Sequence, residues 1–87
     1  MELNKAEIII TIINSKFKTQ NQDDNIFLIV LLLNKYNCKD INLLDNLQIN
    51  SFEKYNSYLE KAEQKILTNY NFRNTYFQVE NSIKLII

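Results

Sequence analysis

The sequence predicts a mainly α-helical fold, of class α+β, in one domain that spans residues 1–87. Apolar residues recur at steps of three and four over most of the chain, which is the spacing of helices with one buried face. Asp and Asn residues precede several of these stretches, at positions where side chains cap helix N-termini. Two runs after residue 66 instead alternate apolar and polar residues, which is typical of a half-buried β-hairpin. An all-α bundle of four or five helices is the alternative.

The residues that are missing exclude most catalytic chemistry. The chain has no Gly, Pro, His or Trp and a single Cys, and its excess of Asn, Ile and Lys indicates an AT-rich genome. Without Gly there is no phosphate-cradling loop, and without His there is neither an imidazole base nor a histidine metal ligand. One cysteine cannot form a zinc site, and we interpret Cys38 as a small buried residue. We therefore expect a protein that is not an enzyme and that has no cofactor or metal.

The charge balance and the length of the apolar runs limit the partners. Ten basic and ten acidic residues give a net charge of zero and a pI of about 6.2, unlike the basic balance typical of proteins that bind nucleic acids. The longest apolar run, 26–33, is far shorter than the ~20 residues that span a bilayer. The first residues show no pattern of a secretory signal. We expect a cytoplasmic protein with no membrane partner.

A first helix is expected over residues 3–18, where five apolar residues follow one another at helical steps. These residues are Leu3, Ala6, Ile10, Ile13 and Phe17. We interpret the stripe as packing within the chain, because a protein of this size needs every apolar face for its core. A homodimer seam is the alternative.

The middle of the chain predicts a buried helix and a short one. Asp23 and Asp24 precede the most apolar stretch and are interpreted as the N-terminal cap of a helix over 25–36, which is apolar on nearly all sides and therefore buried. Asp40 is expected to cap a short helix over 41–47.

A longer helix is expected over residues 51–65, because Asn50 and Glu53 have the spacing of a capping box. Its apolar stripe, which should face the core, is Phe52, Tyr55, Leu59, Ala62 and Ile66. Glu60 and Glu63 share one face and are interpreted as solvated residues rather than as a catalytic pair.

Residues 66–80 fit two structures. With Arg73 and Asn74 as a two-residue hairpin loop, Phe72 faces Thr75 and Tyr70 faces Phe77, so most apolar residues fall on one face. This hairpin is the favoured interpretation. The alternative is a helix whose apolar stripe consists of Phe72, Tyr76, Val79, Ile83 and Ile86.

The order of these elements over residues 25–87 resembles a winged helix-turn-helix domain, with 3–18 as an added N-terminal helix. The resemblance rests on 27–37 as the first core helix, on 41–47, on the turn residue Ile49 and on 51–65 in the place of the recognition helix. It implies that 66–80 is the wing. The sequence departs from the family at Gln48, where Gly is frequent. The resemblance implies recognition of DNA or, as in many winged-helix adaptors, of a protein.

A protein partner is the expected one. Helices that read DNA present cations, whereas here Glu53 and Glu60 offset Lys54 and Lys61. We therefore expect a protein-binding module of the adaptor, inhibitor or immunity type that acts through the exposed face of 51–65 and through 66–80. A winged-helix transcriptional regulator that binds DNA is the alternative. The candidate partner-binding residues are Glu53, Lys54, Asn56, Ser57, Tyr58, Lys61, Arg73 and Tyr76.

Overall fold

Five helices follow one another in the computed structural model, which describes residues 4–87. They are α1 (Lys5–Lys16), α2 (Gln22–Lys35), α3 (Ile41–Asn46), α4 (Phe52–Thr68) and α5 (Tyr70–Lys84). No strand occurs within residues 4–87, so the fold is the all-α alternative and the predicted α+β class is wrong. The Cα radius of gyration of 12.1 Å is close to the value of about 12 Å expected for a compact chain of this length.

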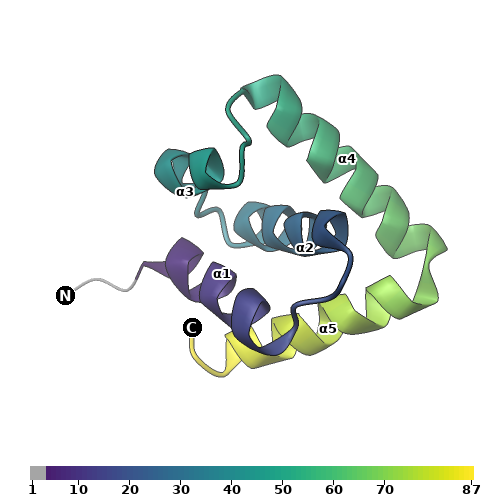
Figure 1. Ribbon diagram of the computed structural model, residues 1–87. Helices are drawn as coiled ribbons and strands as arrows, with labels where there is room; N and C mark the ends of the chain where they lie inside the picture. The colour runs from purple at the N-terminus through teal and green to yellow at the C-terminus, as the bar shows by residue number, and fades with distance from the viewer. Residues whose placement is uncertain (1–3) are drawn as a thin grey trace.

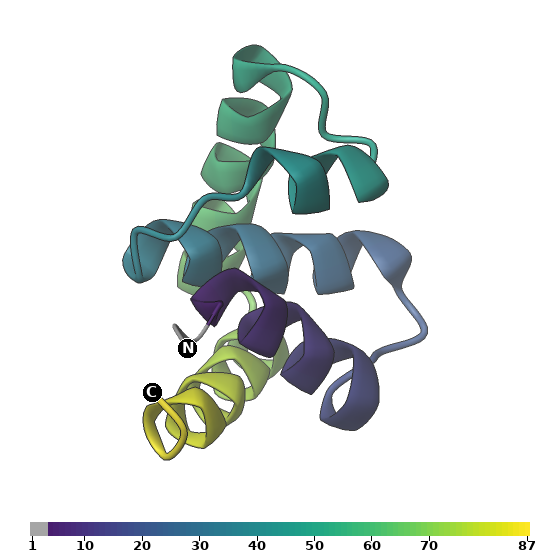
Figure 2. The same cartoon turned by 90° about the vertical axis from the view of Figure 1, so that its left-hand side faces the viewer.

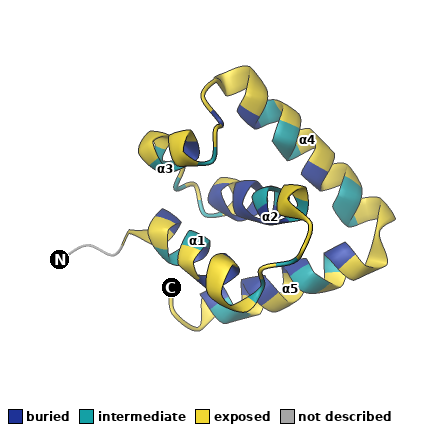
Figure 3. Ribbon diagram, in the orientation of Figure 1, coloured by how far each residue is buried: buried dark blue, intermediate teal, exposed yellow. Residues whose placement is uncertain are grey.

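Helix α2 lies at the centre, with α1, α4 and α5 packed around it (Figure 1). Its residues 28–33 are all buried, which places core side chains on every side of the helix (Figure 3). A helix that is apolar all round is stable in water only when neighbours cover it on several sides. The prediction that this stretch is the buried element is therefore confirmed, with helix ends that differ by a few residues.

Side-chain oxygens cap the start of every helix. The capping residues are Asn4, Asn21, Asp40, Ser51 and Asn69. The cap at Asp40 was predicted correctly. Elsewhere the position shifts: Asn21 rather than Asp23 or Asp24 caps α2, and Ser51 rather than Asn50 caps α4. The two aspartates lie in the first turn of α2, where their charge still complements the helix dipole.

Two helix ends take up the left-handed conformation without glycine. Asn37 (φ 53°) follows α2 and Gln48 (φ 64°) follows α3. After α3, the N–H of Gln48 donates to the carbonyl of Asp45 (2.8 Å) and that of Ile49 to Leu44 (2.9 Å), which is the Schellman arrangement. Gln48 therefore adopts a positive φ at a steric cost, whereas Gly would adopt this conformation freely.

The apolar stripe of α1 is rotated from the predicted one. Ala6, Ile9, Ile12 and Ile13 are buried, whereas Ile10 and Phe17 are only half-buried and Leu3 lies outside the described residues. The buried side packs on α2 and α5. These side chains are thus already covered within a single chain.

The predicted wing over residues 66–80 is wrong, and with it the resemblance to a winged helix-turn-helix domain. These residues form the end of α4 and most of α5, which meet at a corner (Figures 1 and 2). The chain turns at Asn69, which ends α4 and caps α5 by accepting from the Phe72 N–H (2.9 Å), and not at Arg73 and Asn74. The helical stripe prevails because Phe72, Tyr76, Val79 and Ile83 are then all buried together. Ile86, the last residue of that stripe, stays exposed.

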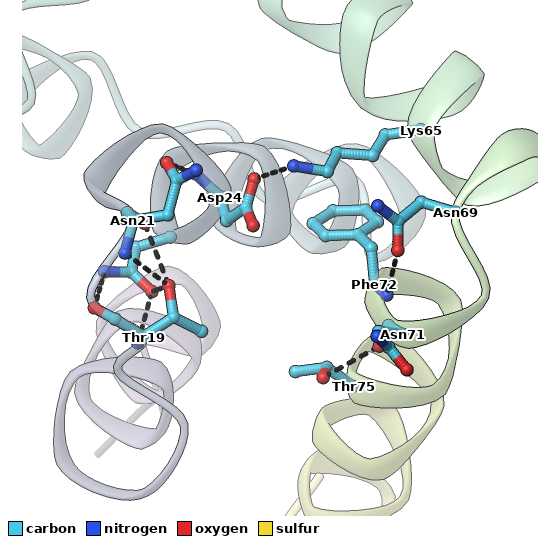
Figure 4. A network of polar contacts seen from close by, with 9 residues as sticks. Thr19, Asn21, Asp24, Lys65, Asn69, Asn71, Phe72 and Thr75 are labelled. Carbon is cyan, nitrogen blue, oxygen red and sulfur yellow. Dashed lines mark hydrogen bonds and ion pairs between the residues drawn. The ribbon is translucent and has the colours of Figure 1, made fainter.

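Ion pairs tie α2 to its two long neighbours. Lys35 of α2 pairs with Glu80 of α5, and Lys84 approaches the same carboxylate to 3.3 Å. Burial raises the pKa of Glu80, but hydrogen bonds with Lys35, Lys84 and Tyr76 outweigh this and hold it below its ordinary value. At the other end of α2, Asp24 pairs with Lys65 of α4 (Figure 4). None of the helices within residues 4–87 has the length and apolarity that crossing a bilayer requires.

Candidate functional site

The solvent side of α4 carries six of the eight residues predicted to bind a partner. Tyr55 and Ala62 fix the orientation of this helix, because both are buried against the core. The core position predicted for Tyr55 is confirmed. The remaining residues of α4 are therefore distributed around two flanks and an outer edge.

The charged residues of α4 are sorted by sign. At about 100° per residue, Lys54, Lys61 and Lys65 fall within an arc of about 40° on one side of the core stripe. Glu53, Glu60 and Glu63 fall within about 80° on the other side. We call the first set, with Tyr58, the lysine flank and the second, with Asn56, the glutamate flank. Ser57 and Gln64 lie on the exposed outer edge between them.

The lysine flank borders a polar groove of about 960 Å³ between the α1–α2 connection, the first turns of α2 and the end of α3. Six carboxamides line it, and we call it the carboxamide groove: Asn14, Gln20, Gln22, Asn25, Asn46 and Gln48. Lys18, Asp23 and Lys54 supply its charges, and the apolar part of its lining comes from Ile26, Ile29 and Leu47.

Only one of the six carboxamides is engaged. The Asn25 side chain accepts from the Thr19 N–H (2.9 Å) and donates to the Thr19 carbonyl (3.2 Å), which holds the α1–α2 connection in place. Among residues 4–87, the side-chain amides of the other five make no hydrogen bond within the protein. They are therefore free to bond with a ligand.

Aromatic packing positions the α4 side of this groove. The Tyr58 ring lies 5.9 Å from that of Phe27, at an angle of 57°. Lys65, besides pairing with Asp24, places its ammonium 5.4 Å from the centre of the Phe72 ring (Figure 4). Lys65 is thus occupied within the fold, while Lys54 and Lys61 form no ion pair with any residue among 4–87.

A second, smaller groove of about 300 Å³ opens between α3 and the start of α4, beside the glutamate flank. Its lining is mostly apolar, and we call it the apolar groove: Ile41, Leu44, Ile49, Phe52 and Tyr55. Ile41 and Phe52 are 76% and 69% exposed, although both belong to apolar stripes. The Lys39 ammonium lies 5.0 Å from the centre of the Phe52 ring and 4.5 Å from that of Tyr55.

Two titratable side chains near the apolar groove, Tyr55 and Cys38, have raised pKa values. Burial, followed by the nearby Cys38, raises the pKa of the Tyr55 hydroxyl, which has no hydrogen-bond partner within residues 4–87. Burial also raises the pKa of Cys38, although Lys5 opposes it. A raised pKa keeps the thiol protonated at neutral pH, which is the opposite of what a nucleophile needs.

Arg73 and Tyr76, the two predicted partner-binding residues within 66–80, are not exposed for contact with a partner as predicted. Arg73 donates to the carbonyls of Ile66 (2.8 Å) and Leu67 (3.1 Å), so its guanidinium closes the last turn of α4. Tyr76, predicted to bind a partner, is buried. Burial and then the Glu80 carboxylate raise its pKa, so its hydroxyl stays protonated.

The structure divides the six predicted partner-binding residues of α4 among the two flanks and the outer edge. Lys54, Tyr58 and Lys61 belong to the lysine flank, whereas Glu53 and Asn56 belong to the glutamate flank and Ser57 to the outer edge. Sequence reasoning missed the exposed Ile41 and Phe52, because their spacing matches the core stripes. It also missed the sorting by sign, although a helical projection of residues 52–68 contains it.

Comparison of the chain with protein-family models, with curated protein sequences and with solved structures finds no significant match. Within the described residues, no group of three His, Cys, Asp or Glu side chains is placed to hold a metal ion. Any assignment of function therefore depends on the chemistry of the two grooves.

Proposed function

We propose that the protein is a non-enzymatic protein-binding module, of the adaptor, inhibitor or immunity type, that takes an extended acidic segment of its partner into the carboxamide groove. The observation that carries this proposal is the lining of that groove. Five carboxamides whose side chains make no hydrogen bond within residues 4–87 line a volume of about 960 Å³, next to Lys54 and Lys61, which form no ion pair within the same residues.

Carboxamides suit the backbone of a peptide. Each side chain of Asn or Gln offers both a donor and an acceptor, as each peptide unit does. The volume lies near the upper end of the ~300–1,000 Å³ typical of ligand sites, which fits a chain segment better than a single side chain. Ile26, Leu47 and Tyr58 supply apolar contacts between the polar groups.

The charges of the groove favour an acidic segment. Among residues 4–87, Lys18 and Lys54 line it against a single carboxylate, Asp23, and Lys61 extends the lysine flank by two turns. Opposite charges across an interface speed association and fix register. Nucleic acid is the competing ligand, but three lysines supply few phosphate contacts, and Arg73 is engaged within the fold.

The test is a selection of short random peptides displayed on yeast, with the purified protein as bait. We expect the wild-type protein to enrich acidic peptides and Lys54→Glu to lose that enrichment. Lys5→Glu changes the net charge equally at an exposed position on α1 and should enrich the same peptides as the wild type.

Two outcomes would contradict the proposal. One is a peptide pool whose charge and sequence are the same for the wild type and for Lys54→Glu. The other is tighter binding of a single- or double-stranded oligonucleotide than of the selected peptides, in a gel shift at low salt.

A further inference from the structure

We propose a second interface, in which the apolar groove and the glutamate flank together bind a basic amphipathic helix of another protein. It lies on the other side of α4 from the carboxamide groove, and it stands or falls independently of the function proposed for that groove.

Exposed apolar side chains mark the centre of this surface. Ile41 on α3 and Phe52 on α4 stand on the two sides of the apolar groove and are both more than two-thirds exposed. Leu44, Ile49 and Tyr55 line the same groove but are themselves buried. A volume of about 300 Å³ fits one large apolar side chain as an anchor.

One carboxylate lines this groove, and three more continue from it along α4. Asp45 lines it, Glu53 follows Phe52 directly, and Glu60 and Glu63 continue along α4. From Glu53 to Glu63 the flank runs for about 15 Å, which is about three turns of a helix. None of these four carboxylates takes part in an ion pair among residues 4–87.

The aromatic rings of the groove already receive a cation. Lys39 is the only basic residue in its lining within residues 4–87, and its ammonium lies over the rings of Phe52 and Tyr55. Attraction of this kind stabilises ammonium and guanidinium groups over aromatic faces. Lys39 thus occupies these ring faces within the fold, so the carboxylates along α4, and not the rings, attract the Lys or Arg residues that flank a partner's apolar anchor.

The spacing of the glutamates favours a helix over an extended strand. Glu53, Glu60 and Glu63 recur at helical intervals along one side of α4. A second helix packed alongside α4 presents cations every three or four residues, so that several can pair with this row while one apolar side chain enters the groove.

The experiment uses a fluorescent synthetic helix that carries Lys on one face with a single Phe among them, and measures its binding by anisotropy. We expect the wild-type protein to bind it at about 50 mM salt and several-fold more weakly at about 300 mM. Phe52→Ala should weaken binding about tenfold, and Glu53→Lys/Glu60→Lys/Glu63→Lys about thirtyfold or more.

A matched pair of single variants separates local from overall charge. Glu60→Lys and Glu7→Lys make the same change in net charge at exposed helical positions, but Glu7 lies on α1. We expect Glu60→Lys to weaken binding several-fold and Glu7→Lys to leave it within about twofold. All these side chains are exposed, and circular dichroism checks that the helix content is unchanged.

Several results would overturn the interface. They are failure of the basic helix to bind the wild-type protein, equal binding by the triple variant, or equal weakening by Glu60→Lys and Glu7→Lys. Equal binding of a control helix with Glu in place of each Lys would overturn it as well.

Discussion

The two flanks of α4 differ in what they offer a partner, although they belong to one helix of 17 residues. The lysine flank faces a wide polar groove with five carboxamides that make no side-chain hydrogen bond within residues 4–87. The glutamate flank meets a small apolar groove with two exposed apolar side chains. The contrast shows that a net charge of zero can conceal two surfaces of opposite sign. A module that binds an acidic segment on one side and a basic helix on the other would connect two proteins.

The orientation of both flanks depends on the burial of Ala62, and disrupting this packing should have the largest effect on stability and on binding. Ala62 is fully buried between the two flanks. Ala62→Asp places an unpaired carboxylate in the core, so we expect a loss of about 3 kcal/mol or more of unfolding free energy. Urea denaturation measures this loss, and binding of both the acidic peptide and the basic helix should fall together. Undiminished binding of either ligand would show that its surface does not require the orientation of α4.

Reversing the lysines should abolish one side only. Lys54→Glu/Lys61→Glu places two carboxylates beside the carboxamide groove, and we expect affinity for the acidic peptide to fall about thirtyfold. Both side chains are exposed and form no ion pair among residues 4–87, so the fold should persist. Isothermal titration measures the affinity. An acidic peptide that binds this variant as tightly as the wild type would place the site elsewhere.

The buried carboxylate of Glu80 should make the stability of the fold depend on pH. The pKa of Glu80 is held below its ordinary value in the folded protein, so its contribution to stability is complete above that value and is lost as the pH falls through the lowered one. We expect Glu80→Gln to lower stability at neutral pH and to reduce the loss on acidification. Thermal unfolding over a range of pH measures both effects, and a profile of Glu80→Gln that matches that of the wild type would contradict this role of the Glu80 carboxylate.

The smallest effects should come from the two left-handed helix ends. Gln48→Gly and Asn37→Gly should each raise the unfolding free energy by about 0.5–1 kcal/mol, because Gly adopts a positive φ without strain. Only Gln48 lines the carboxamide groove, so only Gln48→Gly should also weaken the acidic peptide, by about twofold to threefold. Equal effects of the two variants on peptide binding would argue against a direct contact with Gln48.

The central helix could be predicted from the sequence because its apolar stretch allows only one interpretation. The stretch 26–33 is apolar on every side, and only a central helix can bury it. Residues 66–80 were ambiguous because their apolar residues fit both a period of 2 and a period of 3.6. With 14 Asn residues in the chain, cap and turn signals occur at many positions, so Asn69 and Asn74 could not be distinguished locally.

The two proposed binding surfaces could be predicted from the sequence only in part. The sign of each charge and its angle around α4 follow from the sequence alone. The exposure of Ile41 and Phe52 does not, since it depends on how α3 is placed against α4. The capture of Arg73 by the carbonyls of Ile66 and Leu67 likewise requires the corner between α4 and α5, which a hairpin interpretation lacks.

The account is tested most directly by mapping both ligands on one isotope-labelled sample by NMR. We expect the acidic peptide to shift the amide signals of Asn46, Lys54 and Tyr58, and the basic helix to shift those of Ile41, Phe52 and Glu60. Each ligand should bind with unchanged affinity when the other is saturating. Shifts at the same residues for both ligands, or competition between them, would contradict two separate interfaces on α4.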